Sequence, residues 1–308
     1  MSNGDVCTAS LSPYNWPSRM LDLVRLTPLM ELSPGRPEVV IGVVDGPLPS
    51  DHPLVDTSRV RRLHEQSYES CTPHNSACAH ASAVSAILCA RRGSGAPAIC
   101  PGCTLLVDPI FVEMTQPSGG AGQSVPSARP EELASAVAEC VQAGVNLINL
   151  SLALVESSAA SERAVKEALD WAAKRGVLIV AAAGNDGVVG GSAITRHPGV
   201  LPVAACDQRG GPLNQSNVGH AIGRRGLMAP GQGFPIPDVD GEGTLFGGTS
   251  AATAFVTGAV ALLQSVFPRL SLAVIRQAIT GATTRRRTTV VPPVLDAWAA
   301  YESLTRIS

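Results

Sequence analysis

The sequence predicts an α/β protein in three layers, with a mostly parallel central sheet and helices on both of its faces. Apolar runs of strand length alternate with helix-length stretches over short links, which is typical of a parallel sheet with crossover helices. Hydrophobic residues make up 45% of the 308 residues, which is enough to build a large core. Aromatic residues make up only 4%, so small aliphatic side chains must fill that core and let helices lie close to the sheet.

The first half of the chain begins this alternation. A continuous apolar run over residues 38–45 predicts a buried strand, because strands covered on both faces show no polar alternation. Residues 80–92 predict a helix that Gly93 ends, and residues 104–111 predict a strand. Residues 114–129 are rich in Gly, Ser and Pro and predict a surface loop.

The second half continues the pattern. Its expected elements are a helix from Pro130 to Gly144, a strand over 145–151, a helical stripe over 164–176, strands over 177–183 and 201–206, and a helix over 251–263. The first of these helices starts with a proline and two acidic residues, which suit the first turn. The last helix is small and apolar on every side, so we expect it to be fully buried.

No repeat and no linker of disordered composition divides the chain, so residues 38–308 are expected to form one domain. Residues 1–37 are expected to be an extension packed on it. Residues 1–10 lack a basic segment followed by an apolar one, so no signal peptide is expected. About 44 residues before Asp45 are too few for a signal peptide and a folding prodomain together. A cytoplasmic protein is the expectation.

Charge and hydropathy exclude two classes of partner. The net charge is -2, whereas proteins that bind nucleic acids usually carry a basic excess. The longest apolar runs, 39–44 and 177–183, are far shorter than the ~20 residues of a membrane helix. Neither nucleic acid nor membrane is therefore expected as a partner, and the oligomeric state stays open.

The eight cysteines are mostly expected to be free thiols, because the cytoplasm is reducing. Local disulfides Cys71–Cys78 or Cys100–Cys103 are the alternatives. The Cys100-Pro-Gly-Cys103 stretch has CxxC spacing, but no second pair completes a four-thiolate zinc site. The acidic residues lack the spacing of a calcium loop, and Asp238-Val-Asp240 is interpreted as a polar loop. No metal and no cofactor are expected.

Four polar residues stand where predicted elements begin or end. Asp45 ends the first strand, His80 opens the next helix, Asn185 follows a strand, and Ser250 precedes the buried helix. Each has an ordinary structural alternative: a turn-forming Asp or Asn, a surface His, or a helix N-cap Ser. In an open parallel sheet, however, ligands bind beyond the carboxyl ends of the strands, where these residues would meet.

Their order, Asp then His then Ser, is that of subtilisin. Val43-Val-Asp45-Gly46 resembles the aspartate motif of subtilisin-like serine proteases. The stretch starting at His80 matches their histidine motif at Val84 and Ile87, and Gly248-Thr-Ser250-Ala-Ala resembles their serine motif. Ile148-Asn-Leu-Ser-Leu152 and Ala182-Ala-Gly-Asn185 are similar to the two segments that line the family's substrate cleft, and Met228-Ala-Pro-Gly231 to a further signature. The resemblance spans residues 38–282 and implies a three-layer subtilisin-like fold.

A narrower resemblance is to the proteases that mature cyanobactin peptides. It is carried by Asp45-Gly-Pro47, His52-Pro53, Gly102-Cys103 before a strand ending in Pro-Ile-Phe111, and Ala181-Ala-Ala-Gly-Asn-Asp-Gly187. This resemblance implies a substrate: the precursor of a ribosomally made, modified peptide, from which the enzyme removes the leader. Relatives that cyclise carry an added helical insertion near the histidine, and the short step from His80 to the strand at Thr104 predicts linear products instead.

The resemblance also implies roles for individual residues. Ser250 would attack the scissile carbonyl, His80 would relay the proton, Asp45 would orient His80, and Asn185 with the Ser250 N–H would bind the oxyanion. The expected substrate-binding residues are Leu150, Ser151, Leu152, Ala153, Ala182, Ala183 and Gly184. An extended peptide would lie along the first four of these. The resemblance further implies a cis bond between His197 and Pro198.

The chain departs from the family motifs at four positions: Ala81, Ser82, Ala153 and Ala254. Ala153 replaces a glycine of the cleft strand, which leaves the cleavage preference open. Alternatives are a general intracellular subtilisin-like protease and a catalytically dead binding protein of the same fold. A nucleotide-binding α/β protein is disfavoured because no glycine fingerprint follows the first strand. The basic run 285–287 is interpreted as a solvated loop, or as a contact for an acidic leader.

Overall fold

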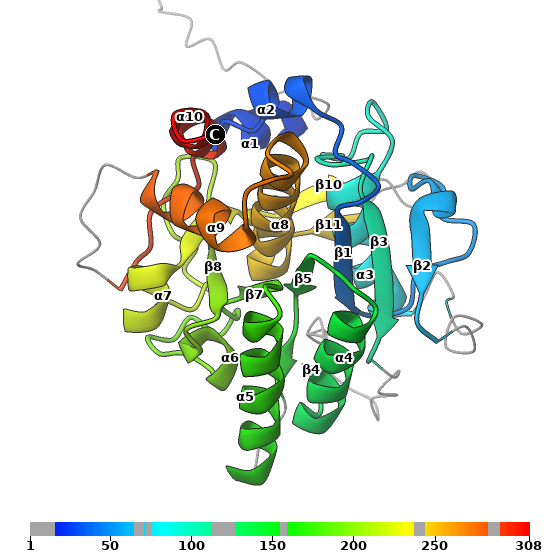
Figure 1. Cartoon of the computed structure of the whole chain (residues 1–308), viewed down its shortest axis with the longest axis vertical. Coiled ribbons are helices and arrows are strands. Elements are labelled where there is room, and N and C mark those ends of the chain that lie inside the picture. The colour runs from blue at the N-terminus through cyan, green and yellow to red at the C-terminus, as the bar shows by residue number, and fades with distance from the viewer. Residues whose placement is uncertain are drawn as a thin grey trace, which may run out of the picture.

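A computed structural model describes residues 16–64, 71, 75–111, 127–154, 159–236, 244–282 and 290–308. Its centre is a seven-stranded sheet in which every neighbouring pair is parallel (Figure 1). In spatial order the strands are β2 (Val60–Arg62), β3 (Thr104–Pro109), β1 (Val40–Asp45), β5 (Leu147–Leu150), β7 (Leu178–Ala182), β8 (Val200–Cys206) and β9 (Leu227–Pro230). The predicted α/β class and parallel sheet are confirmed.

The strand order reverses at β1. From β1 the chain first adds β2 and β3 on one side, with β3 next to β1, and then β5, β7, β8 and β9 on the other. Such a reversal leaves a crevice beyond the carboxyl ends of the two strands that flank it, here β1 and β5. Asp45, the last residue of β1, lies at this crevice.

Helices cover both faces of the sheet. The helices α3 (Ser76–Cys89), α8 (Gly248–Val266) and α9 (Leu272–Gly281) pack on one face, and α4 (Pro130–Gln142) and α5 (Ala159–Lys174) pack on the other (Figure 1). Neighbouring residues of β1 serve the two faces in turn, with Val43 in the core under α8 and Val44 in the core under α4. All six residues of β1 are therefore buried, which explains its uninterrupted apolar run.

Two N-terminal helices, α1 (Trp16–Leu23) and α2 (Thr27–Leu32), lie beside the C-terminal helix α10 (Ala297–Thr305) (Figure 1). The Arg25 guanidinium donates to the Asp296 carboxylate at 3.0 Å, and the Trp16 ring stacks on Phe234 at 4.3 Å between centroids. Leu26 and Leu29 have no exposed surface and belong to the main core. This described part of the N-terminal extension thus shares one core with the rest of the chain.

Smaller elements complete the structure. They are the 3₁₀ turn η2 (Thr57–Arg59), α6 (Ala193–Arg196), α7 (His220–Arg225), the antiparallel pair β10 (Phe234–Ile236) and β11 (Thr244–Phe246), and the parallel pair β4 (Ser127–Ala128) and β6 (Ala153–Leu154). The pair β10–β11 leads directly into α8, so it positions the first turn of that helix.

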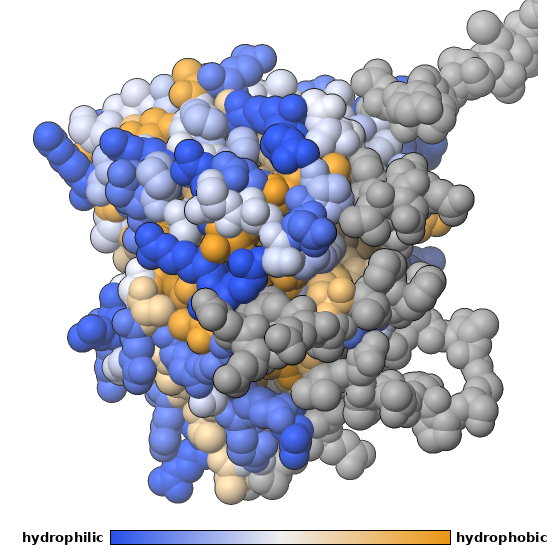
Figure 2. Space-filling model, turned by 90° about the vertical axis from the view of Figure 1, so that its right-hand side faces the viewer, coloured by the Kyte–Doolittle hydropathy of each residue, from blue (hydrophilic) through white to orange (hydrophobic). Residues whose placement is uncertain are grey.

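Helix α8 is long and apolar enough to cross a membrane, but 94% of it is buried inside the protein. It contacts β5, β7, β8 and β9 as well as α3, which makes it the central core helix, as its composition predicts. Hydrophilic residues cover much of the face shown in Figure 2, with smaller hydrophobic areas between them.

The helix that carries His80 begins earlier than predicted. Asn75 caps α3 by accepting a hydrogen bond from the Cys78 N–H at 2.9 Å, so the helix starts at Ser76 and His80 lies in its second turn. The prediction that His80 opens the helix is wrong. The small residues 76–79 form its first turn but show no apolar periodicity, so the sequence pattern did not indicate a helix there. Similarly, α8 starts at Gly248, with Gly247 rather than Ser250 at the N-cap.

The expected cis bond at His197–Pro198 is also wrong, since this bond is trans. His197 ends α6 in an extended conformation, which a following proline favours. The turn then closes through a hydrogen bond from the Val200 N–H to the His197 carbonyl at 3.2 Å. The His197 ring, 5% exposed, lies 3.1 Å from Asp170 through its Nε2 atom. These contacts hold the turn with the ordinary trans isomer, which X–Pro bonds prefer.

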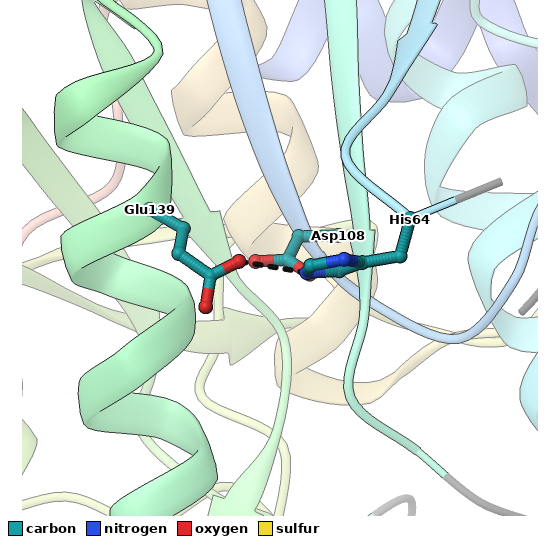
Figure 3. A group of neighbouring side chains, drawn as sticks. All are labelled: His64, Asp108 and Glu139. Atoms are coloured by element: carbon teal, nitrogen blue, oxygen red, sulfur yellow. Dashed lines mark hydrogen bonds and ion pairs between the residues drawn. The ribbon is translucent and has the colours of Figure 1, made fainter.

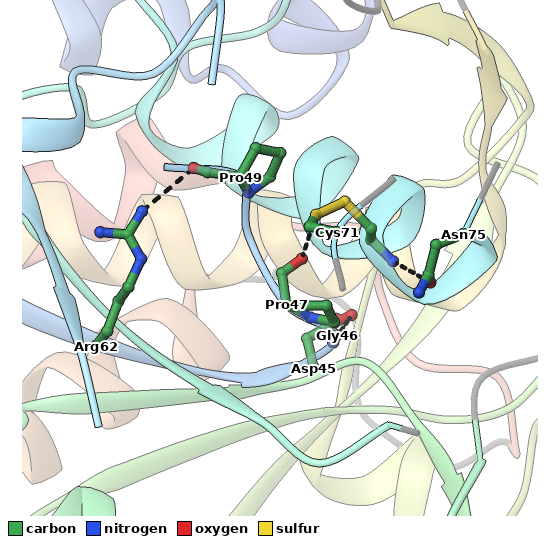
Figure 4. The surroundings of a disulfide bond; sticks show 8 residues. Asp45, Gly46, Pro47, Pro49, Arg62, Cys71 and Asn75 are labelled. Atoms are coloured by element: carbon green, nitrogen blue, oxygen red, sulfur yellow. Dashed lines mark hydrogen bonds between the residues drawn. A yellow bond between two sulfur atoms is a disulfide. The ribbon is translucent and has the colours of Figure 1, made fainter. Parts of the chain in front are cut away.

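Of the two suggested disulfides, the structure contains Cys71–Cys78, with 5.5 Å between the Cα atoms. Figure 4 shows it beside the turn that follows β1, with the Cys71 sulfur 3.6 Å from the Pro47 carbonyl oxygen. Cys100 and Cys103 are both reduced, and so are three further buried cysteines: Cys89, Cys140 and Cys206. The hydrogen bond with the Cys100 thiol, and secondly burial, raise the pKa of Cys103 well above its ordinary value, so this thiol is protonated and unreactive.

Several sequence-based interpretations fall outside the described residues. These are the position of Cys7, most of the loop over 114–129, the Asp238-Val-Asp240 stretch and the basic run 285–287.

Candidate active site

Asp45 and His80 form a close pair at the carboxyl edge of the sheet. One oxygen of Asp45, Oδ1, lies 2.7 Å from the His80 Nδ1 atom and accepts a second hydrogen bond, also 2.7 Å long, from the Gly46 N–H. The Asp45 side chain is fully buried and that of His80 is 11% exposed. Among the described residues, the second oxygen of Asp45 has no hydrogen-bond partner. The pair fixes His80 with Nδ1–H toward the carboxylate and leaves Nε2 to face outward as a base.

Gly46 allows the helix to come this close to the strand. A Cβ atom placed on Gly46 would lie 2.1 Å from the Ala77 carbonyl oxygen, in the first turn of α3. Any side chain at this position would push α3 away from β1 and separate His80 from Asp45. The Asp-Gly sequence is therefore required by packing, in addition to its turn chemistry.

Ser250 lies in the first turn of α8. The residue is 6% exposed, and its hydroxyl donates a hydrogen bond to the Ser151 carbonyl at 3.4 Å. Among the described residues, no hydrogen bond joins Ser250 to His80. Catalytic hydrogen bonds are often long or unformed before substrate binds.

A buried polar network holds α8, the helix of Ser250, against β5. The Thr257 hydroxyl donates to the Asn149 side-chain oxygen at 2.9 Å, and the Asn149 amide donates to the Ser151 hydroxyl at 2.9 Å. The Ser151 hydroxyl donates in turn to the Ser250 carbonyl at 3.3 Å. Sequence reasoning missed Thr257, whose partner stands 108 positions away in the chain. The network fixes the height of α8 relative to the sheet edge.

Asn185 lies beside this first turn. Its side-chain oxygen accepts hydrogen bonds from the Thr249 N–H at 2.9 Å and the Thr249 hydroxyl at 3.1 Å. Among the described residues, its side-chain NH₂ has no acceptor, so the donor is free for a ligand. A fixed amide donor next to the N–H groups of a helix's first turn is the arrangement that stabilises an oxyanion.

Gly248 makes the approach of Asn185 possible. Its φ of +70° lies in the left-handed region, and an added Cβ would lie 2.9 Å from the Asn185 Oδ1 atom and 3.0 Å from Nδ2. We expect Gly248→Ala to lower kcat by about 10²-fold, because it displaces the amide donor. The control is Gly281→Ala, where nothing lies within 4 Å and φ is ordinary. Steady-state kinetics on a fluorogenic peptide measures both, and an unchanged kcat in Gly248→Ala would contradict this role.

Phe246 covers the histidine. Its ring, from the last residue of β11, meets the His80 imidazole edge to face at 5.2 Å between centroids. No motif around Phe246 identified it, because the contact depends on how β11 leads into α8. Phe246 limits the rotation of the imidazole and keeps water off one of its faces.

The predicted substrate-binding residues differ in how far their side chains are buried. Leu150, Ser151 and Leu152 are all at least 93% buried, and the two leucines belong to the core under α4. Ala153 pairs with Ser127 in the short β4–β6 ladder. In the second segment Ala183 is buried, whereas Ala182 and Gly184 are partly exposed. Contact with an extended peptide through these side chains stays a prediction.

His52 contacts the backbone of α3 at Ser82, and its burial favours the uncharged imidazole. Its Nδ1 atom accepts the N–H groups of Leu54 and Val55, each at 3.2 Å. Burial lowers the pKa of His52 to about 4, and the backbone of Ser82 partly offsets this effect. Because the unfolded chain binds a proton near pH 6.5 and the folded chain does not, the free energy of unfolding decreases as the pH falls from 6.5 to 4.

We expect His52→Gln to remove about 2 kcal/mol of this pH dependence between pH 7 and pH 4.5, following 1.36 kcal/mol for each pKa unit. Urea unfolding of both proteins at pH 7 and pH 4.5 measures the difference. His220→Gln, at an exposed position, is the matched control. Parallel pH profiles for His52→Gln and the unsubstituted chain would show that His52 is protonated in the folded state.

The parallel sheet, its reversal at β1, an Asp–His pair at the sheet edge and a serine in the first turn of a buried helix define a protein of the subtilisin-like class. The chain belongs to the subtilase family of peptidases (S8), whose model matches residues 36–294. This match includes Asp45, His80, Asn185 and Ser250.

Curated relatives agree with this assignment. Subtilisin DY of Bacillus licheniformis is 31% identical over 156 residues, covering 49% of this chain and 54% of that protein. Subtilisin E of Bacillus subtilis (strain 168) is 25% identical over 251 residues, covering 80% of this chain and 60% of that protein. The chain thus spans about half of the length of the curated relatives it matches.

The similarity to solved structures extends over nearly the whole chain. The prenylagaramide maturation protease PagA superposes with a TM-score of 0.76 at 25% identity, over 91% of this chain and 98% of that one. The patellamide maturation protease PatA gives a TM-score of 0.69 at 26% identity, over 88% and 98%. A lanthipeptide protease, at 19% identity and a TM-score of 0.72 over 96% of both chains, shares the fold.

Proposed function

We propose that this protein is a serine endopeptidase that hydrolyses peptide bonds through an acyl-enzyme. The observation that carries the proposal is the 2.7 Å contact between Asp45 and His80 at the sheet edge. This contact prepares His80 as a base beside the first turn of α8, where Ser250 lies. Labelling by a fluorophosphonate probe tests it, since such probes react only with an activated serine; absence of labelling would contradict the proposal.

In the proposed reaction, the Ser250 hydroxyl turns from the Ser151 carbonyl toward His80 Nε2 and attacks the scissile carbonyl carbon. His80 accepts the hydroxyl proton and donates it to the leaving amine as the C–N bond breaks. The Asp45 carboxylate stabilises the imidazolium between these steps. The Asn185 NH₂ and the Ser250 N–H bind the oxyanion of the tetrahedral intermediate, and water then releases the acyl group.

The proposed substrate is a ribosomally made precursor peptide, and the proposed product is its core without the leader. Two relatives support this substrate class, because PagA and PatA are maturation proteases of the peptides prenylagaramide and patellamide. The motif resemblance at Asp45-Gly-Pro47 and around Asn185 points the same way. A short precursor gene beside this one, with modifying enzymes, would supply the natural substrate.

We expect linear products. The stretch between α3 and β3, residues 90–103, is fully described and contains no inserted helix that could shield an acyl-enzyme from water. Mass spectrometry of the cleaved precursor decides this point, because a hydrolysed core is heavier than the corresponding macrocycle by one water. A dominant dehydrated, cyclic core would contradict the proposal of simple hydrolysis.

We also place the protein in the cytoplasm. Five buried free thiols among the described residues are typical of a reducing compartment. Thiol counting on denatured, freshly lysed material should then find at least four free thiols, and four disulfides would contradict this location.

A further inference from the structure

A second cluster of titratable side chains lies on the α4 face of the sheet. It consists of His64, just after β2, Asp108 near the end of β3, and Glu139 on α4. One ligand atom from each residue lies within 4.8 Å of the other two. Figure 3 shows the three side chains converging between α4 and the segment that follows β2.

The backbone brings His64 to this position. Strand β2 pairs with β3 in parallel, with Arg62 opposite Val107, and the Leu63 N–H continues the ladder to the Val107 carbonyl at 3.3 Å. His64 therefore follows along β3 next to Asp108. Its Nε2 atom lies 2.7 Å from the Glu139 Oε2 atom and 3.9 Å from the Asp108 Oδ1 atom.

Asp108 is the unusual member of this cluster. Its side chain is 2% exposed, and among the described residues its Oδ2 atom has no hydrogen-bond partner. Burial, and secondly the charge of Glu139, raise the pKa of Asp108 to about 6. A simple His64–Glu139 hydrogen bond would satisfy those two residues. Among the described residues, however, it leaves the Asp108 Oδ2 atom buried without a hydrogen-bond partner and Oδ1 only at ion-pair distance from His64. A bound cation would satisfy both.

Glu139 is oriented for such a role. Its second oxygen, Oε1, accepts a hydrogen bond from the Ser135 hydroxyl, one helical turn earlier, at 3.1 Å. This contact leaves Oε2 directed toward His64. Metal-binding carboxylates are commonly held by such an outer hydrogen bond, which fixes their orientation.

We propose that His64, Asp108 and Glu139 bind one divalent transition-metal ion of the Zn²⁺ class, which fastens the segment after β2 to β3 and α4. One imidazole nitrogen and two carboxylate oxygens suit Zn²⁺ better than Ca²⁺ or Mg²⁺, which prefer oxygen ligands alone. Ligand atoms around a tetrahedral Zn²⁺ lie about 3.3 Å apart, between the two distances that His64 makes here. His64 is 51% exposed, so water can complete the coordination.

The site lies outside the catalytic crevice but on the same strands. Asp108 pairs with Val44, the neighbour of Asp45, and faces the opposite side of the sheet from His80. A metal there would strengthen the attachment of β2, a three-residue strand at the sheet edge. We therefore assign it a structural role, with no part in bond cleavage.

Calorimetric titration of the metal-free full chain with ZnCl₂ tests the proposal. We expect a single Zn²⁺ to bind, with affinity at least about 100-fold lower in His64→Gln and Glu139→Gln and about 10-fold lower in Ser135→Ala. Glu167→Gln and His220→Gln are matched controls away from the cluster, and His80→Gln excludes binding at the catalytic pair. Absence of Zn²⁺ binding, or unchanged affinity in Glu139→Gln, would overturn the proposal.

Thermal unfolding gives an independent measurement. Zn²⁺ in about 100-fold excess over its Kd should raise the melting temperature of the unsubstituted chain by about 5 °C. Asp108→Asn should lose this shift, and in chelator it should melt no lower than the unsubstituted chain, because it removes a buried charge whose Oδ2 atom has no hydrogen-bond partner among the described residues. An equal Zn²⁺ shift in Asp108→Asn, or a lower melting temperature in chelator, would contradict the site.

Discussion

Ser250→Ala should lower the rate of peptide cleavage about 10⁶-fold, the size of the effect in subtilisin itself, and abolish fluorophosphonate labelling. The reason is that the other hydroxyl in the first turn of α8, that of Thr249, is bound to the Asn185 side chain and is not available to replace it. Binding of peptide should persist, since the crevice walls and the Asn185 donor remain. A residual rate above that in water is expected from these groups alone.

The fold should survive this substitution. The Ser250 hydroxyl makes one long hydrogen bond, to the Ser151 carbonyl, so its loss should change stability little. Ser265→Ala is the matched control, a serine on the same helix whose hydroxyl bonds within the helix to Ala261. Cleavage retained by a folded Ser250→Ala protein, measured with the same peptide, would refute the assignment of the nucleophile.

Asp45→Asn should lower kcat about 10⁴-fold with a smaller effect on KM. A single carboxylate oxygen receives both the His80 and the Gly46 hydrogen bonds. If the amide keeps its oxygen toward His80, it lacks the negative charge that stabilises the imidazolium. If instead it turns its NH₂ toward His80, it forces the wrong tautomer. Either arrangement removes the base from Ser250.

The control for this variant is Asp207→Asn, which follows β8 and accepts hydrogen bonds from the Arg209 and Gly211 N–H groups. It should leave kcat unchanged because Asp207 does not touch His80. The two variants are compared by single-turnover kinetics at neutral pH, with circular dichroism as a check on folding. A loss of less than about 10-fold in Asp45→Asn would show that the carboxylate does not orient the base.

Much of the fold could be predicted because its signals are local. The uninterrupted apolar run ending at Asp45 predicts a strand covered on both faces, and the chain has such a strand between two helical layers. Pro130 and the acidic residues after it predict the start of α4 correctly. The predicted start of α3 was wrong because its capping residue, Asn75, precedes four small residues with no helical pattern.

The site was predicted in part for the same reason. Asp45, His80 and Ser250 stand in short motifs that a reader can find along the chain. Thr257, Phe246 and Ser135 stand in no motif, and their roles arise from contacts with distant segments. The trans bond before Pro198 depends on how the surrounding turn closes.

The sequence by itself determined the strand–helix alternation, the order of the proposed catalytic residues and the identity of the family, since each depends on residues close together in the chain. Only the tertiary structure decided which of the two suggested disulfides exists, how Asn149 and Thr257 join β5 to α8, and that His64, Asp108 and Glu139 meet. The physical reason is the order of the strands. Placing β3 beside β1 and β2 brings together side chains whose spacing in the sequence carries no signal.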